Sequence, residues 1–533
     1  MKLINPFKKK QETESEQKKN YSGFHIDAKP RLITLPTLKN RKEINIRYPL
    51  LPPFAFAHIF WDDKEKELVY FVEEPKLDDK EKEILELIYK ALEEMINISF
   101  FEHAQTTFLT EYLEKNVQAI LKEVGIVISK ESYLKIMYYV YRNSVGLNQI
   151  EPLMNDYYIE DIECNGVGFP IYVVHRRFEN LRTNIIFNDF EEATDFVEKL
   201  AQKSGRYISF ANPLLDGTLP DGSRVNATYS KDITTRGPTF TIRKFTKNPL
   251  TPTHLIRSNT ASARVFAYLW LAIENKLNIM VIGETASGKT TLLNAIADFI
   301  PFESRICSIE DTRELNLVHE NWLPAVTRAG FGIPNILGKK YGGISLFDLL
   351  KETYRQNPDY IIVGEVRGPE TSVLFQGMAS GHPSLGTFHA GSVEALVRRL
   401  ETPPINLPRS LISSLDIVVM TIHAKERDRN IRRVREVIEV IEVGSEIGSL
   451  KTNTMFKWDQ PNDRFLANKY SKVFEKISEL SGVELKKIKE EWELRTRLLQ
   501  RLADSNIVMF DDLAKIIKLF YESPEAVIKQ FKL

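Results

Sequence analysis

Residues 278–291 read Asn-Ile-Met-Val-Ile-Gly-Glu-Thr-Ala-Ser-Gly-Lys-Thr-Thr, and this stretch decides the fold of the central part of the chain. Residues 283–290 match the phosphate-binding pattern G-x-x-x-x-G-K-[ST]. The apolar run 278–282 predicts a buried strand before the loop, and residues 291–299 predict an amphipathic helix after it. Such a loop points its N–H groups inward, and the helix behind it adds the positive end of a dipole. The stretch therefore predicts a site for the phosphates of a nucleotide, against the alternative of a glycine-rich turn that binds none.

The residue types within the loop have distinct expected roles. Lys289 is expected to reach the β- and γ-phosphates, and the hydroxyl of Thr290 to ligate Mg²⁺. The other residues expected to hold the nucleotide are Gly283, Thr285, Ala286, Ser287, Gly288 and Thr291. The pattern thus predicts a nucleoside triphosphate and Mg²⁺ as cofactors.

Carboxylates follow two further apolar strands. The strand predicted at 306–309 is followed by Glu310, and the strand predicted at 360–363 by Gly364 and Glu365. The carboxyl ends of parallel strands face the ligand crevice, so both carboxylates are expected beside the loop. A single acidic residue after a strand is often only a surface cap, but two in order after a phosphate-binding loop favour a functional role.

Two histidines, His382 and His389, lie in the segment 381–390. A lone histidine is more often a packed or surface residue. Two of them within eight residues, next to Gly386 and Thr387, are able to place polar groups at a γ-phosphate.

The four segments 283–290, 310–315, 363–367 and 381–389, taken in this order, resemble the motifs of the type II/type IV secretion-system ATPase superfamily. Its members are RecA-like hexameric motors of pilus assembly, secretion and archaeal motility filaments. The resemblance implies an α/β fold class: a RecA-like P-loop ATPase core with a preceding α+β (PAS-like) domain and extra N-terminal and C-terminal α+β segments. It also implies that the chain hydrolyses ATP.

The same resemblance implies roles for individual residues. Glu365 is expected to position or activate the attacking water. Glu310 is expected to tune that water or the Mg²⁺ ion, directly or through a water, and the division of labour between the two carboxylates stays open. His389 is expected to contact the γ-phosphate, and Arg328 to act near the site or at a subunit boundary.

The region before the core shares the resemblance. Segments 219–226 and 240–245 look like the domain that precedes the RecA core in that superfamily. Arg224 and Arg243 are therefore expected to reach the nucleotide phosphates and neutralise charge, as an arginine finger does. The alternative for Arg224 is that it caps a hairpin turn. Weaker matches to the same role are Arg206 and Arg236.

Segments that are similar to archaeal pilus-assembly ATPases are 48–55, 69–75 and 400–409. The chain has only two cysteines, so it lacks the paired C-x-x-C zinc insert of many bacterial assembly ATPases. The insert 331–343 and the pair Pro403-Pro404 favour a pilus or secretion motor. The motility-filament branch shares most core motifs and stays the alternative.

Composition and periodicity, taken together with the family resemblance, predict five parts, and the arginine contribution and the RecA-like assignment follow from the resemblance. The parts are a disordered tail (1–22), an N-terminal α+β domain (23–146), an α+β domain that contributes the arginines (147–250), a RecA-like ATPase domain (251–445) and a mainly helical C-terminal region (446–533). Strands and helices alternate in the fourth part, which predicts a parallel sheet covered by helices.

Charge and composition narrow the classes of partner. The 533 residues include 72 basic and 72 acidic ones, and 43% are hydrophobic. This excludes a mainly disordered chain, and the neutral balance argues against nucleic acid as a partner. No stretch is long and apolar enough to span a membrane, and the start does not resemble a signal peptide. We therefore expect a cytoplasmic protein whose membrane role, if it has one, is peripheral, and the resemblance implies that it associates with the inner face of the cell membrane.

The resemblance implies a homo-hexamer that acts on a polytopic membrane platform protein. The predicted output is assembly of a type IV pilus-like filament, or type II/IV secretion. The alternatives are an archaellum assembly or rotation ATPase, a conjugation-type traffic ATPase, and an ATP-gated scaffold that hardly hydrolyses.

Overall fold

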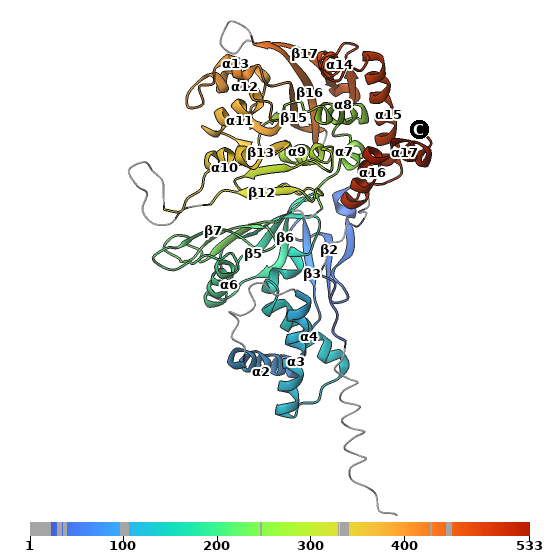
Figure 1. Ribbon diagram of the computed structural model, residues 1–533. Coiled ribbons are helices and arrows are strands. Elements are labelled where there is room, and N and C mark those ends of the chain that lie inside the picture. Colours follow the sequence, from blue (N-terminus) through green and yellow to red (C-terminus); the bar gives the residue numbers. More distant parts are fainter. Residues whose placement is uncertain are drawn as a thin grey trace, which may run out of the picture. The chain divides into compact units, whose positions relative to one another are not determined.

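The computed structural model divides into two compact units, residues 1–245 and 246–533 (Figure 1). The structure describes residues 23–28, 33, 35, 40–95, 106–245, 248–328, 330, 341–426, 429–443 and 450–533. The tail predicted at 1–22 and most of the insert predicted at 331–343 lie outside these ranges. Within them, no helix combines the length and the apolarity needed to cross a membrane.

The first unit is built on a nine-stranded sheet in the order β1-β2-β3-β6-β5-β4-β9-β8-β7. Strands β1 to β3 form an antiparallel meander, and β3 joins β6 through a short parallel pairing of Val69 with Arg182 and Tyr70 with Thr183. The strands are β1 (Asn45–Leu51), β2 (Ala55–Asp62), β3 (Glu67–Glu73), β4 (Ile159–Cys164), β5 (Pro170–His175), β6 (Glu179–Ile186), β7 (Leu214–Thr218), β8 (Arg224–Thr228) and β9 (Thr239–Arg243). The sheet therefore runs across the boundary predicted at 146/147.

The helices of this unit are α2 (Asp79–Met95), α3 (Thr106–Val124), α4 (Lys130–Ser144), α5 (Glu151–Met154) and α6 (Phe190–Lys203), with 3₁₀ turns at Arg41–Glu43 and Asn148–Ile150. Each end of α6 is marked by a residue suited to end a helix. Asp189 accepts hydrogen bonds from the N–H groups of Glu191 and Glu192, and Gly205 has a φ of 62° just after the helix ends.

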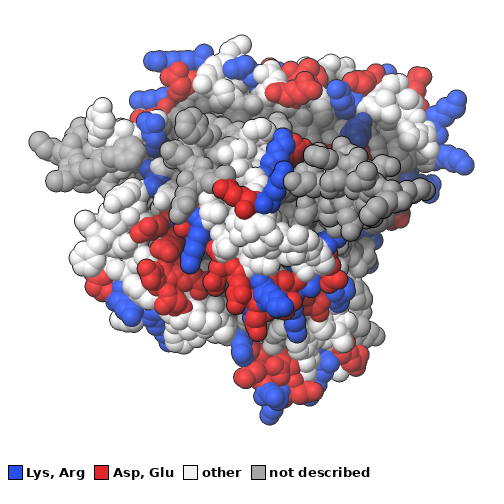
Figure 2. Space-filling view, turned by 90° about the horizontal axis from the view of Figure 1, so that it is seen from below, with Lys and Arg blue, Asp and Glu red and all other residues white. Residues whose placement is uncertain are grey.

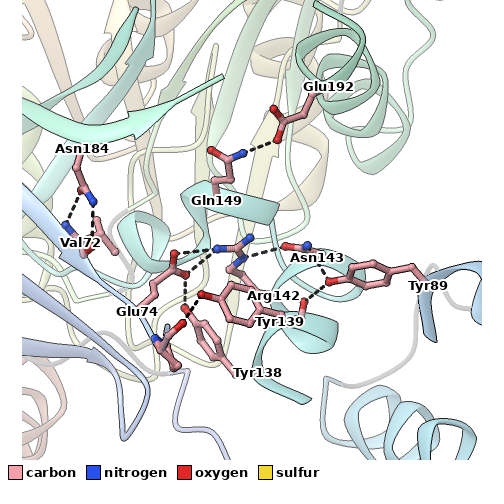
Figure 3. Close-up of polar contacts among 11 residues, drawn as sticks. Val72, Glu74, Tyr89, Tyr138, Tyr139, Arg142, Asn143, Gln149, Asn184 and Glu192 are labelled. Carbon is pink, nitrogen blue, oxygen red and sulfur yellow. Dashed lines mark hydrogen bonds and ion pairs between the residues drawn. The ribbon is translucent and has the colours of Figure 1, made fainter. Parts of the chain in front are cut away.

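Polar contacts tie α4 to the segment that leaves β3 (Figure 3). Arg142 forms an ion pair with Glu74 at 2.8 Å, and the hydroxyl of Tyr138 donates to the same carboxylate at 2.5 Å. The hydroxyl of Tyr139 donates to the carbonyl of Pro75 at 2.6 Å. Burial, with Glu74 as the next cause, raises the pKa of Tyr138 well above its ordinary value, so this phenol keeps its proton and donates. The helix is thus bound to the end of the strand by directional contacts as well as by packing.

The second unit also has a nine-stranded sheet, in the order β12-β11-β13-β14-β10-β15-β16-β17-β18. From β12 to β15 all neighbouring strands are parallel, and from β15 onward they are antiparallel. The strands are β10 (Ile279–Gly283), β11 (Ile306–Glu310), β12 (Trp322–Val326), β13 (Tyr360–Val366), β14 (Ser384–His389), β15 (Ile417–Glu426), β16 (Arg429–Val443), β17 (Leu450–Asp459) and β18 (Arg464–Ala467). The parallel part confirms the prediction of an α/β core.

Helices cover both faces of this sheet. The helices are α7 (Pro252–Arg257), α8 (Ala263–Glu274), α9 (Lys289–Ala297), α10 (Leu346–Thr353), α11 (Glu370–Ala379), α12 (Val393–Glu401), α13 (Arg409–Ile412), α14 (Lys472–Ser481), α15 (Leu485–Asp504), α16 (Phe510–Glu522) and α17 (Pro524–Phe531), with 3₁₀ turns at Tyr354–Gln356 and Gln460–Asn462. Ile279 and Val281 point into the core shared with α8, α9 and the C-terminal helices. Met280 and Ile282 point into the core shared with α10, α11 and α12. Because successive side chains of a strand alternate between faces, β10 must be apolar throughout, as its sequence is.

The C-terminal helices pack on the same core, with α15 along α8 (Figure 1). Arg495 lies over the rings of Trp270 and Phe520, at 4.8 and 5.3 Å from their centroids, and forms an ion pair with Glu274 at 2.6 Å. The region predicted as mainly helical, 446–533, contains the helices α14 to α17 after the strands β17 and β18. Strands β17 and β18 extend the main sheet beyond the boundary predicted at 445/446. The five-part division of the chain stays a prediction.

Candidate nucleotide site

The loop after β10 is bent by residues with positive φ. Gly283, Ala286 and Gly288 have φ values of 159°, 61° and 90°. A Cβ on Gly283 would lie 2.5 Å from the carbonyl oxygen of Thr421, so only glycine fits there. For Ala286 the left-handed conformation costs on the order of 1 kcal/mol, which the surroundings of the loop must offset. The predicted strand, loop and helix are all present.

Neighbouring strands hold both sides of the loop. Gly283 is paired with His389 of β14 on one side and with Thr421 of β15 on the other. The hydroxyls of Ser287 and Thr421 lie 2.9 Å apart, and Ser287 also donates to the carbonyl of Glu284 at 2.8 Å. Thr421 therefore braces the loop from β15. Sequence reasoning did not single out Thr421. It could have been found as Glu310 was, because it is a polar residue near the carboxyl end of an apolar strand.

Lys289 opens α9 with its ammonium turned back on the loop. Its Nζ donates to the carbonyl of Glu284 at 2.9 Å. Partial burial lowers the pKa of Lys289, while the nearby carboxylates of Glu365 and Glu314 oppose that shift and Arg367 adds to it. The structure thus brings the predicted Lys289 and Glu365 into electrostatic contact.

Glu310 is a buried carboxylate in which one oxygen accepts hydrogen bonds and the other has no hydrogen-bond partner among the described residues. Its Oε1 accepts from the N–H groups of Glu314 and Leu315 at 2.9 and 3.0 Å. Its Oε2 has no hydrogen-bond partner in the described part of the chain, although the residue is only 2% exposed. Burial is the main reason that the pKa of Glu310 is raised to about 7. A Cβ at Gly364 would lie 2.9 Å from Glu310 Cγ, so this glycine leaves the space that the carboxylate fills.

Glu365 lies at an irregularity of β13, where the pairing with β14 shifts between Val363 and Val366. Its carboxylate forms an ion pair with Arg367, and Glu365 is the less exposed of the two side chains. The backbone N–H of Arg367 is held by Glu370 Oε1 at 2.8 Å. Glu370 thereby fixes the turn that carries the ion pair of Glu365 and Arg367. Sequence reasoning did not single out Glu370.

The two histidines do not converge. His389 ends β14 beside the loop, and its carbonyl accepts from Arg399. His382 precedes the opposite end of the same strand and packs edge-on against the ring of Tyr354, with centroids 5.1 Å apart. The expectation that both reach one phosphate is therefore wrong for His382. Thr387, between them, donates to the carbonyl of Gly364 at 2.6 Å.

The predicted arginines Arg224 and Arg243 lie in the first unit, on β8 and β9, where they are paired across the two strands. Arg224 reaches Asp216 at 3.2 Å, and Arg243 reaches Asp161 at 3.2 Å. The hairpin turn itself is capped by Asp221, which accepts from Ser223 N. The approach of Arg224 and Arg243 to a nucleotide stays a prediction.

The other predicted arginines have local partners. Arg236 lies over the ring of Phe169 at 4.3 Å from its centroid. Arg328, in the second unit, donates from Nε to the carbonyl of Gly342 at 2.9 Å, and the backbone of Arg206 caps the end of α6 through Ala201. These contacts do not test the roles expected for them.

The donor set fits a magnesium nucleotide. The loop offers a helix N-terminus and an ammonium whose hydrogen bond, among the described residues, goes to a carbonyl of the loop itself. At the same carboxyl-terminal edge of the sheet, at the end of β11, Glu310 Oε2 is a buried carboxylate oxygen without a partner in the described part of the chain. These are the chemical groups that a triphosphate, a divalent cation and a water require.

Comparison with known proteins gives the family. The chain matches the family described as "Type II/IV secretion system protein" over residues 174–446. It is 38% identical over 507 residues to an uncharacterized protein of Methanocaldococcus jannaschii, covering 91% of this chain and 90% of that protein. It is 29% identical over 277 residues to the type IV secretion system protein PtlH of Bordetella pertussis, covering 45% of this chain and 80% of that one. Among solved structures, the ATPase DotB of Legionella pneumophila is 16% identical with a TM-score of 0.40, covering 71% of this chain and 95% of that chain.

Proposed function

The chain belongs to the type II/IV secretion system protein family, and we propose that it is an ATP-hydrolysing motor. The motor powers assembly of a type IV pilus-like filament, or type II/IV secretion, at the cytoplasmic membrane. The observation that carries this proposal is the loop 283–290, with Glu365 in electrostatic contact with Lys289 and with Glu310 at the carboxyl-terminal edge of the same parallel sheet. A loop alone binds a nucleotide, whereas hydrolysis also needs groups that position water and metal.

The loop residues from Gly283 to Thr291 hold the nucleotide in this proposal. Lys289 leaves the Glu284 carbonyl for the β- and γ-phosphates, and the hydroxyl of Thr290 holds Mg²⁺. Bound Mg²⁺ supplies positive charge that offsets the charge on the phosphate oxygens. His389, next to Gly283 in the sheet, contacts the γ-phosphate.

The two carboxylates have different environments and therefore different roles. Glu365, ion-paired with Arg367, orients or activates the attacking water. Glu310, whose pKa is raised to about 7 by burial, takes or releases a proton at Oε2 or holds a metal-bound water there.

Turnover of ATP with Mg²⁺, measured per subunit against protein concentration, tests the function. Wild type is expected to hydrolyse ATP with a rate that rises cooperatively and reaches a plateau, as for a homo-hexamer that completes its sites on assembly. Glu365→Gln is expected to bind ATP normally and to lose roughly a hundredfold or more in turnover. Glu320→Gln, an exposed change at the amino end of β12, is the control.

The outcomes separate the alternatives. Equal turnover of Glu365→Gln and wild type would remove the role proposed for that carboxylate. Tight ATP binding without turnover at any concentration would favour an ATP-gated scaffold. Stimulation by DNA that weakens steeply with salt would favour a conjugation-type traffic ATPase. On the face seen in Figure 2, acidic and basic side chains are interspersed among the described residues, which gives that alternative no support.

The arginines of the first unit are proposed to complete the site. Arg224 and Arg243 exchange their carboxylate partners for phosphates when their domain closes, and reopening after hydrolysis moves a polytopic membrane platform protein. Arg224→Ala and Arg243→Ala should lower turnover, while Arg41→Ala, exposed in the same unit, should not. Archaellum assembly or rotation is the alternative output of the same motor. Prepilin genes beside this gene would support pilus assembly, and archaellum genes would support motility.

A further inference from the structure

Strand β16 brings an arginine to the phosphate-binding loop from outside the motifs that predicted the site. Arg432 donates from Nε to the carbonyl of Ala286 at 3.0 Å. A Cβ on Gly288 would lie 3.4 Å from Arg432 Cδ, so the stem of the arginine lies against the loop as well. Arg432 therefore contacts two of the loop residues that have positive φ.

The register of the sheet explains how Arg432 reaches the loop. Gly283, the last residue of β10, is level with Thr421 of β15. The hairpin of β15 and β16 continues past this level, with His423 paired to Arg432. Arg432 thus lies two residues beyond the end of β10, about 7 Å farther along the strand direction, where the loop curves.

The neighbouring residue fixes this part of β16. Side chains alternate between the faces of a strand, so Arg433 points away from Arg432. Arg433 is 5% exposed and forms a two-pronged contact with Asp463, at 2.9 Å for each prong. Those hydrogen bonds are the main reason that the pKa of Asp463 is lowered to about 2. The base of Arg432 is therefore held by the ion pair of the buried Arg433 with the half-buried Asp463 on the opposite face.

Ala286 is the residue of the loop that most needs an external contact. It is the only one of the three positive-φ residues in the loop that carries a Cβ, and its φ is 61°. Its side chain offers no hydrogen bond of its own, and its carbonyl is the group that Arg432 holds. The two terminal nitrogens of Arg432 make no hydrogen bond within the described residues, so Nε alone carries the polar contact.

We propose that Arg432 is a positioning residue for the phosphate-binding loop: its contact with the Ala286 carbonyl holds the loop in its nucleotide-accepting curvature before ATP arrives. The inference rests on the proposed function for its consequence, tighter ATP binding. The ordering of the loop by Arg432 in the nucleotide-free protein is independent of that function.

The first test needs no nucleotide. Hydrogen–deuterium exchange of the loop amides is compared in wild type, Arg432→Ala, Arg432→Gln and Arg435→Ala, all as full chains. Arg435 is the matched control because it is an exposed arginine of the same strand, in the bulge opposite Met420 and Thr421. Arg432→Ala is expected to speed exchange of the loop roughly threefold to tenfold, the loss of one hydrogen bond, and Arg435→Ala is expected to leave it unchanged.

The second test measures ATP affinity by equilibrium dialysis and splits KM from kcat. Arg432→Ala is expected to raise both Kd and KM roughly threefold to tenfold at unchanged kcat. Arg432→Gln, which keeps an N–H donor without the charge, is expected to restore most of the affinity. An unchanged exchange rate in Arg432→Ala overturns the proposal, whatever the protein does with ATP. Restoration by Arg432→Lys and not by Arg432→Gln also overturns it, since charge and not positioning would then be the cause. If the wild-type protein fails to bind ATP, the proposed function is wrong. The exchange result still decides whether Arg432 positions the loop.

Discussion

Glu310 and Gly364 share one small space: a Cβ on the glycine would lie 2.9 Å from Cγ of the glutamate. Glu310 is anchored on its other side by two backbone N–H groups, of Glu314 and Leu315. A side chain at residue 364 would therefore push the carboxylate away from these two N–H groups. This pair explains why glycine follows the apolar run 360–363 within β13.

Gly364→Ala is therefore expected to displace Glu310 and to lower turnover by on the order of a hundredfold, the effect of a shift of about 1 Å in a catalytic group. Gly386→Ala is the control, because a Cβ there would meet its nearest atoms at 3.5 Å, an ordinary contact. Turnover and thermal unfolding are measured for both variants. If Gly364→Ala kept full turnover in a folded protein, the position of Glu310 would not matter for the reaction.

The raised pKa of Glu310 predicts a dependence of stability on pH. Burial raises this pKa from an ordinary 4.5 to about 7, so the folded protein holds the proton more tightly than the unfolded chain does. The contribution of Glu310 to the unfolding free energy is therefore fully retained below about pH 4.5. It falls by on the order of 3 kcal/mol as the pH rises to about 7. Glu310→Gln keeps an acceptor for the two N–H groups and removes the titration.

The difference in unfolding free energy between Glu310→Gln and wild type should therefore grow in favour of the variant from about pH 4.5 to 7. Denaturant unfolding across that range measures it, with the exposed change Glu320→Gln as the control. A constant difference between Glu310→Gln and wild type would show that Glu310 titrates normally.

Sequence patterns predicted the elements that are local and missed the contacts that are not. The strand and helix around Gly283, and the carboxylates after β11 and β13, follow from short stretches of chain. Thr421 and Arg432 reach the loop only because β15 and β16 lie beside β10, and no spacing in the sequence encodes that neighbourhood. The joining of β3 to β6 rests on two residue pairs more than a hundred positions apart, so the first unit could not be predicted as one sheet.

A buried carboxylate also organises the C-terminal part of the sheet. Glu439 is fully buried and accepts from the hydroxyls of Tyr268 and Ser471, at 2.7 and 2.5 Å, and from Lys472 N at 2.7 Å. Glu439→Ala leaves these donors without an acceptor and is expected to cost about 2–5 kcal/mol. Glu442→Ala, an exposed change on the same strand, should cost less than about 0.5 kcal/mol. Denaturant unfolding of the full chain compares the two, and equal costs would contradict the role given to Glu439.

The ion pair of Glu74 and Arg142 offers a matched comparison within the first unit (Figure 3). Their side chains are only 21% and 11% exposed, and a phenol donates to the same carboxylate. A double-mutant cycle with Glu74→Ala and Arg142→Ala is expected to give a coupling of about 1–3 kcal/mol, because little water screens the pair. The adjacent residue Glu73 pairs with Arg47 at 2.7 Å, but there the arginine is 54% exposed.

The same cycle on Glu73 and Arg47 is expected to give less than about 1 kcal/mol, since solvent screens that pair and the free side chains lose entropy on pairing. Both cycles are measured by denaturant unfolding at the same ionic strength. Raising the salt concentration should reduce the coupling of the exposed pair and leave that of Glu74 and Arg142 nearly unchanged. Equal couplings with equal salt dependence would mean that burial does not strengthen the contact that ties α4 to the end of β3.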